Sequence, residues 1–222
     1  FRLGVEFSSR MNLDRPEYYS DLFFWQSSGL SGKDIILTSK LPQDPFDDSK
    51  TDELRRHDIS AIALNSGATK VSEVPVFLHY PSLHRPVTDS LFDGSRSAES
   101  KWLKQKVAQY WVDRNYWTDL FLAERIKTYV TWNRFDASHI PLADAIESVG
   151  GISAIYQRAF QRDPSPIIAV SADLMFGYAP DDAEIERRSG STVPFHVSVG
   201  YFGDHRAPLL RNRAQVIRKQ LR

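Results

Sequence analysis

Polar side chains that can exchange protons follow one of the apolar runs in the second half of the sequence. Asp136, Ser138 and His139 stand between the apolar run at 126–132 and a helical pattern. A helix N-terminus favours anions through its free amides and its dipole. A carboxylate or an imidazole beside it can take a proton from a hydroxyl group when burial tunes it. We therefore take His139 and Asp136 as candidate general bases. Alternatively, Asp136 and Ser138 cap the helix and His139 belongs to a polar surface.

A second pair of candidates, Gln157 and Arg158, closes the apolar run at 152–156. The planar guanidinium group of arginine suits phosphate or carboxylate, and the amide of glutamine suits sugar hydroxyls. These residue types indicate a substrate-binding role. The alternative is that they take part in an ordinary surface salt bridge.

Asp204 and His205 follow the apolar run at 195–199, after a segment with two glycines. Glycines allow a ligand to approach the backbone closely, so this pair is a third candidate for the wall of a cleft. A turn between two domains would use the same glycines. Glu6 and Ser8, at the end of the first apolar run, complete the set of candidate binding residues.

The elements that carry these residues alternate along the chain as strand, helix and strand. Repeated β-α-β units predict an α/β protein with a Rossmann-like parallel sheet and helices on both faces. Ligand-binding residues of such sheets lie at the carboxyl ends of the strands, where the candidates fall. An irregular stretch at 65–96 holds one short apolar run, 76–80. The expected strands are 2–8, 34–39, 59–64, 126–132, 152–157, 174–178 and 195–199, and the expected helices are 18–28, 49–57, 97–124, 140–149, 181–188 and 208–222.

The helix expected at 97–124 carries an aromatic stripe. Large apolar residues recur there at helical spacing, so we interpret the stripe as a face that packs into the core. Its members are Leu103, Val107, Tyr110, Trp117 and Phe121, widened by Trp102, Trp111 and Leu120.

The composition excludes several classes of protein and site. The chain has 222 residues, of which 28 are basic and 28 acidic, so no net charge attracts it to nucleic acid. It has no cysteine, which excludes disulfides, thiolate metal sites and a cysteine nucleophile, and which suits the cytoplasm. Neither of the phosphate-binding motifs G-x-x-x-x-G-K-[ST] and G-x-G-x-x-G occurs. The zinc-binding motif H-E-x-x-H and the hydrolase serine motif G-x-S-x-G do not occur either. Asp-x-Asp, which holds a metal in one class of glycosyltransferase, does not occur either.

Longer phrases of the sequence resemble a known family. The run 126–160, IKTYVTWNRFDASHIPLADAIESVGGISAIYQRAF, resembles bacterial surface-polysaccharide biosynthesis proteins of the GT-B glycosyltransferase type. The phrases ADLMFGYAPDDAEIERRSGS and FHVSVGYFGDH look like the strand, helix and strand that complete the N-terminal domain of such proteins. In the first half, GLSGKDIILTSKLP and ELRRHDISAIALN fit the same plan.

The resemblance implies one half of a GT-B architecture. Residues 1–205 would form the Rossmann-like, acceptor-side domain, and 206–222 a basic linker helix toward a C-terminal donor domain that this chain does not contain. The protein would transfer a sugar from a nucleotide-sugar, as co-substrate, to a glycan or lipid-linked acceptor in capsule or lipopolysaccharide assembly. It would need no metal or other cofactor. His139 or Asp136 would deprotonate the acceptor, and the substrate-binding residues would be Glu6, Ser8, Ser138, Gln157, Arg158, Asp204 and His205.

Two other functions fit the same residues. A sugar-nucleotide epimerase of similar two-domain shape would also need a proton acceptor, which Asp136 or His139 would supply. A non-catalytic Rossmann-like domain could instead bind or scaffold a polysaccharide assembly complex, with the basic tail at 208–222 touching the inner face of the cytoplasmic membrane or forming a solvated linker. The sequence leaves the sugar, the acceptor, the stereochemistry and the oligomeric state open.

Overall fold

The computed structural model describes residues 1–7, 10–15, 17–18, 20–39, 46–64, 97–132, 134 and 137–221. The apolar run at 76–80, Ser8 and Asp136 therefore lie outside the described residues.

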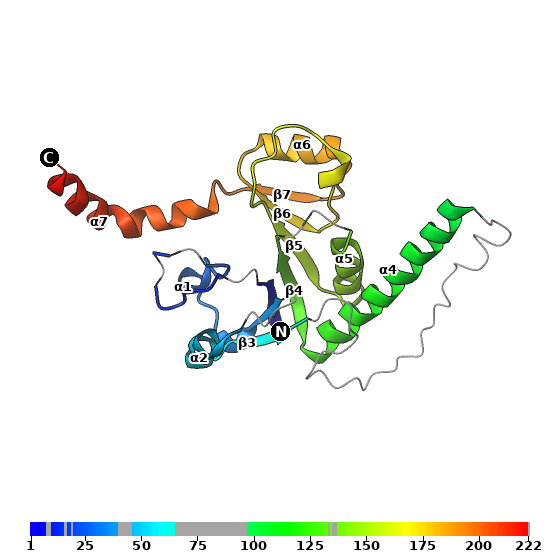
Figure 1. Ribbon diagram of the computed structural model, residues 1–222, viewed down its shortest axis with the longest axis horizontal. Helices are drawn as coiled ribbons and strands as arrows, with labels where there is room; N and C mark the ends of the chain where they lie inside the picture. The colour runs from blue at the N-terminus through cyan, green and yellow to red at the C-terminus, as the bar shows by residue number, and fades with distance from the viewer. Residues whose placement is uncertain are drawn as a thin grey trace.

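In the part of the chain that the structure describes, seven parallel strands form one sheet in the order β3-β2-β1-β4-β5-β6-β7 (Figure 1). This confirms the predicted Rossmann-like α/β fold. From β1 to β3, each new strand is added on one side of the sheet. From β4 to β7, each new strand is added on the opposite side. The strand order thus reverses between β1 and β4, the point at which such sheets bind ligands. The strands are β1 (Arg2–Glu6), β2 (Ile35–Ser39), β3 (Ser60–Ala63), β4 (Ile126–Thr131), β5 (Ile152–Tyr156), β6 (Leu174–Gly177) and β7 (Phe195–Ser198).

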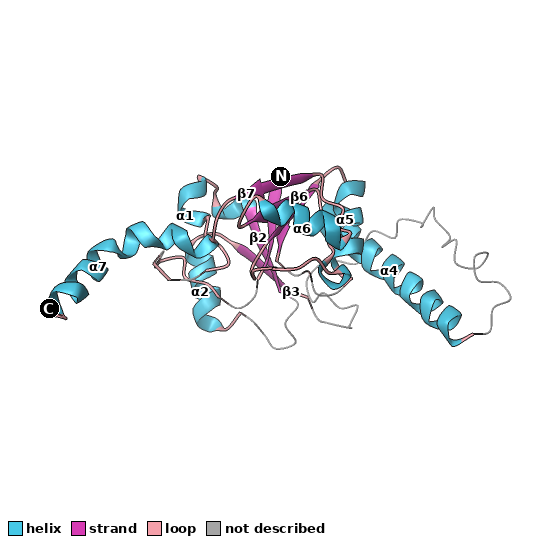
Figure 2. Ribbon diagram, turned by 90° about the horizontal axis from the view of Figure 1, so that it is seen from above, coloured by secondary structure: helices cyan, strands magenta, loops and turns pink. Residues whose placement is uncertain are grey.

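Helices lie on both sides of the sheet, as Figures 1 and 2 show. We name the two sides by the helices that pack on them. On the α5 face, Tyr129 lies in one apolar cluster with Trp117 of α4 and Ile146 of α5. On the α2 face, Val5 clusters with Leu54 of α2. The helices are α1 (Trp25–Ser28), α2 (Asp48–Arg56), α4 (Ala98–Ala123), α5 (His139–Ser148), α6 (Asp181–Ser189) and α7 (Ala207–Gln220), with 3-10 turns η1 (Gly32–Asp34), η2 (Pro166–Ile168) and η3 (Phe202–Arg206).

The helix predicted at 18–28 is wrong over most of its length, because only α1, its last turn, is helical. Asp21 exchanges hydrogen bonds with the backbone of Arg10 instead: its amide donates to the carbonyl, and its carboxylate accepts from the amide at 3.3 Å. The Ser20 hydroxyl accepts from the amide of Leu22. Short polar side chains that bind nearby backbone compete with a helix in this way. Gly29 ends α1 with a φ of +68°, as its position predicts.

The aromatic stripe of α4 is a core face only toward the helix C-terminus. Trp117 and Phe121 are buried, whereas Trp102 is 58% exposed and Leu103 is 41% exposed. A helix of 26 residues is roughly 39 Å long, about twice the length of the strands beneath it. The N-terminal half of α4 therefore extends past the sheet (Figure 1).

Tyr116 on α4 gives the fold a pH dependence in the alkaline range. Burial raises the pKa of its hydroxyl to about 12. An unfolded tyrosine loses its proton near pH 10, so the unfolded state releases protons first and the free energy of unfolding falls between pH 10 and 12. We expect Tyr116→Phe to lessen this fall, as measured by urea unfolding at pH 9 and pH 11. Equal pH dependence in the two proteins would contradict the burial of this hydroxyl.

Candidate functional site

A row of buried polar side chains crosses the α5 face at the carboxyl ends of the central strands. Glu6 of β1 pairs with Thr38 of β2, and Val5 pairs with Val130, so Glu6 also lies beside Thr131 of β4. Gln157 follows the last residue of β5, two positions beyond the partner of Thr131. These four residues form the polar row: Thr38, Glu6, Thr131 and Gln157, all buried.

Glu6 is the ionisable member of the polar row, and it lies where the strand order reverses. The Thr131 hydroxyl donates a hydrogen bond to the Glu6 carboxylate. Burial and the nearby Glu6 carboxylate raise the pKa of Tyr129, which therefore stays a neutral phenol, 2.5 Å from the Thr38 hydroxyl. A carboxylate held between strands in this way can accept a hydrogen bond or a proton from a ligand hydroxyl.

Gln157 supplies a hydrogen-bond donor to the same row. Its side-chain oxygen accepts a hydrogen bond from the backbone amide of Tyr178 at 2.9 Å, and its backbone amide donates to the carbonyl of Phe176. Its side-chain nitrogen is buried and has no hydrogen-bond partner in the part of the chain that the structure describes. Buried donors are nearly always paired in folded proteins. The side-chain NH₂ group of Gln157 is therefore available to pair with a ligand oxygen. Because Gln157 is buried, the surface role considered for it is wrong.

Arg158 lies on the α2 face of the same sheet edge. Its guanidinium carbon is 4.3 Å from the centroid of the Trp132 ring, and its terminal nitrogen is 3.6 Å from the carboxylate of Asp21. The Asp21 side chain is fully buried, so the arginine charge offsets a carboxylate that water does not reach. Arg158 thus ties β5 to the segment before α1. The sequence did not indicate either partner, because Trp132 was predicted as the end of a strand and Asp21 as part of a helix.

His139 and Ser138 lie at the start of α5. His139 is the first helical residue and is buried, which contradicts a place on a polar surface. The helix packs Leu142 and Ile146 against the core of the α5 face, and it begins where β4 has just ended. Its N-terminus is therefore on the same face and the same edge of the sheet as the polar row. Asp136, the second candidate base, and Ser8 are outside the described residues.

The third candidate pair is not brought to the polar row. Asp204 is exposed and, with the backbone of His205, belongs to η3 after β7. Three strand spacings separate β7 from β4, which is roughly 14 Å. The candidate site therefore consists of the polar row around Glu6 and the start of α5 at His139. It does not include Asp204.

A buried ion pair joins Arg134, which lies between β4 and α5, to α6. Arg134 lies 2.7 Å from the carboxylate of Glu186 on α6 and also donates to the carbonyl of Ile168. The Glu186 carboxylate accepts a further hydrogen bond from the Ser191 hydroxyl at 2.7 Å. Both charged side chains are almost completely buried. The ion pair holds Arg134 against α6, and no pattern in the sequence indicated it.

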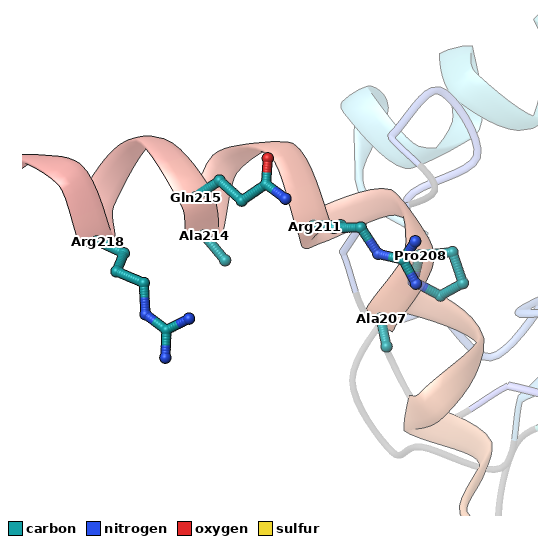
Figure 3. A pocket seen from close by; sticks show the side chains of 6 residues that line it. All are labelled: Ala207, Pro208, Arg211, Ala214, Gln215 and Arg218. Carbon is teal, nitrogen blue, oxygen red and sulfur yellow. The ribbon is translucent and has the colours of Figure 1, made fainter.

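A shallow hollow elsewhere on the molecule is unrelated to the polar row. It follows one side of α7, which points away from the sheet (Figures 1 and 3). Its lining residues are Ala207, Pro208, Arg211, Ala214, Gln215 and Arg218. Within the described ranges, no group of three His, Asp or Glu side chains is arranged to hold a metal ion. In those ranges, no helix has the length and apolar character needed to span a bilayer.

Comparisons with family models, with curated proteins and with solved structures find no match to this chain.

Proposed function

We propose that this chain is the acceptor-side domain of a glycosyltransferase, which passes a sugar from a nucleotide-sugar to a glycan or lipid-linked acceptor in capsule or lipopolysaccharide assembly. One observation carries the proposal. Two buried groups suit hydroxyls: the Glu6 carboxylate, where the strand order reverses, and one strand further the Gln157 side-chain amide, which has no partner among the described residues. The resemblance of 126–160 to surface-polysaccharide proteins of the GT-B type supports the same function.

In the proposed reaction, a hydroxyl of the acceptor attacks the anomeric carbon of the donor sugar. The bond to the nucleotide phosphate breaks, and the phosphate leaves with the bonding electrons. His139 takes the proton of the attacking hydroxyl, while Glu6 and Gln157 bind acceptor oxygens. Thr131 holds the Glu6 carboxylate in place through its hydrogen bond. Charge on the leaving phosphate is offset by the positive end of the α5 helix dipole.

The test is to assay the full-length protein with nucleotide-sugars, with and without a glycan acceptor. Turnover that requires the acceptor supports sugar transfer. Isomerisation of the nucleotide-sugar without any acceptor would identify the epimerase instead. If the protein binds a glycan but no nucleotide-sugar, it is a non-catalytic binding domain. Each of the last two results would contradict the proposal.

Single substitutions separate the roles of the two central residues. We expect His139→Ala to lower kcat by at least about 100-fold, which is the usual contribution of a general base. Glu6→Gln should mainly raise the KM for the acceptor, since it weakens binding of a hydroxyl. The matched control is His57→Ala, because His57 follows α2 and bonds Asp14 at 2.8 Å, away from the polar row. A kcat that survives His139→Ala would refute the assignment of the base.

A further inference from the structure

The α2 face of the sheet is covered over β1 to β3 and over the carboxyl end of β5, where Ala154 and Tyr156 are buried, but it is open over β6 and β7. Strand register places Phe195 and Val197 of β7 beside Leu174 and Phe176 of β6 on this face. Phe195 is 68% exposed and Val197 is 42% exposed, and no helix in the described part of the chain covers them. We call this surface the open face, formed by Ile152, Leu174, Phe176, Phe195, Val197 and Val199.

The last helix, α7, is itself uncovered. None of its residues is buried, and it extends away from the sheet (Figures 1 and 2). Leu210, Ala214, Ile217 and Leu221 recur at intervals of four, three and four residues. These positions fall within a narrow stripe on one side of a helix, so we call them the α7 stripe. One molecule thus exposes both an apolar sheet face and an apolar helix stripe.

The charges of α7 and of the rest of the chain are opposite in sign. Five of the 28 basic residues fall in 207–222, which contains none of the 28 acidic residues. Residues 1–206 consequently carry a net charge of −5, with 23 basic and 28 acidic residues. The basic helix is therefore attracted to the body of the protein, and its stripe can bury the open face. Its 14 residues span about 21 Å, enough to cross the strands from β4 to β7, which span roughly 14 Å.

The path of the chain directs α7 to another molecule. Arg206, the residue before α7, already has helical angles of φ −82° and ψ −18°, so η3 continues into α7 without a turn. The helix leaves the carboxyl edge of the sheet and cannot lie on the open face of its own chain in this arrangement. We propose that two copies of the chain exchange α7, with the stripe of each packed on the open face of the other. A two-fold axis makes the exchange reciprocal, so both apolar surfaces are buried twice.

Oligomeric state is the first test, and it does not depend on the proposed function. We expect light scattering on the eluted chain to give twice the 25.4 kDa of one copy. Ile217→Glu should shift the population to the monomer, and α7 has no buried residue whose change would unfold the body. Ile167→Glu is the matched control, because Ile167 is 77% exposed on η2, apart from both surfaces. A dimer that resists Ile217→Glu, or a monomeric unmodified chain, would overturn the exchange.

Cross-linking identifies which copy α7 covers. The chain has no cysteine, so Val197→Cys combined with Ile217→Cys introduces the only two thiols. On oxidation we expect a disulfide between chains, seen as a dimer on a denaturing gel without reductant. A disulfide within one chain would show that α7 folds back on its own sheet, against the proposal. Binding of α7 to vesicles of anionic lipid by a monomer would also overturn it. Val197→Cys with Ile167→Cys should give no cross-linked dimer.

Discussion

Glu186→Ala is expected to lower the free energy of unfolding by about 3–5 kcal/mol, the usual effect of removing one partner of a buried ion pair. The Glu186 carboxylate lies 2.7 Å from the Arg134 guanidinium, and the two side chains are 4% and 3% exposed. Without the carboxylate, the arginine charge is left in the interior with the Ile168 carbonyl as a neutral partner. Urea unfolding of the two proteins measures the loss.

The same helix provides the control. Glu184 pairs with Arg187 one turn away, but these side chains are 51% and 74% exposed. Glu184→Ala should therefore cost less than about 1 kcal/mol. A double substitution, Arg134→Met with Glu186→Leu, should recover most of the stability, because it removes both charges and fills the space. If the two glutamate variants unfold at the same urea concentration, Arg134 and Glu186 are not a buried pair.

Trp117→Ala is expected to cost about 3–5 kcal/mol, since it leaves a large cavity under α4. The Trp117 ring stacks on Phe121 with centroids 5.5 Å apart, and its edge meets Tyr129 of β4 at 5.4 Å. This contact joins the helix to the central strand of the α5 face. Thermal or urea unfolding followed by circular dichroism measures the effect.

Trp102 on the same helix is the matched control. It is 58% exposed on the part of α4 that extends past the sheet, so Trp102→Ala should change the free energy of unfolding by less than about 1 kcal/mol. Equal losses from the two tryptophan substitutions would mean that the N-terminal half of α4 also packs into a core.

The order of strands and helices was predictable because parallel strands buried on both faces leave continuous apolar runs. The runs at 34–39 and 126–132 correspond to β2 and β4 to within one residue. The helix ends were marked as well: Gly150 and Gly190, with φ of +70° and +89°, follow α5 and α6. Local signals of this kind need no knowledge of distant residues.

The partners of the candidate site were not predictable, because they are far apart in the sequence. Thr131 reaches Glu6 across 125 residues, and Asp21 meets Arg158 across most of the chain. Helical spacing also gave a wrong prediction where tertiary contacts decide which residues are buried. It predicted one continuous core face on α4, whereas the length of the sheet decides how much of that face is covered. His139 was placed at a helix start correctly, and its role stays a prediction.

The interior position of β1, beside the central strand β4, constrains how the protein folds. Arg2 pairs with Ile126, so joining the two halves of the sheet closes a loop of more than 120 residues. Closing a long loop costs chain entropy, and contacts distant in sequence form slowly. During synthesis, β1 to β3 emerge well before β4, and the inner edge of β1 then has no neighbour. For that interval an interior strand of the finished sheet is an unprotected edge, open to pairing with other nascent chains.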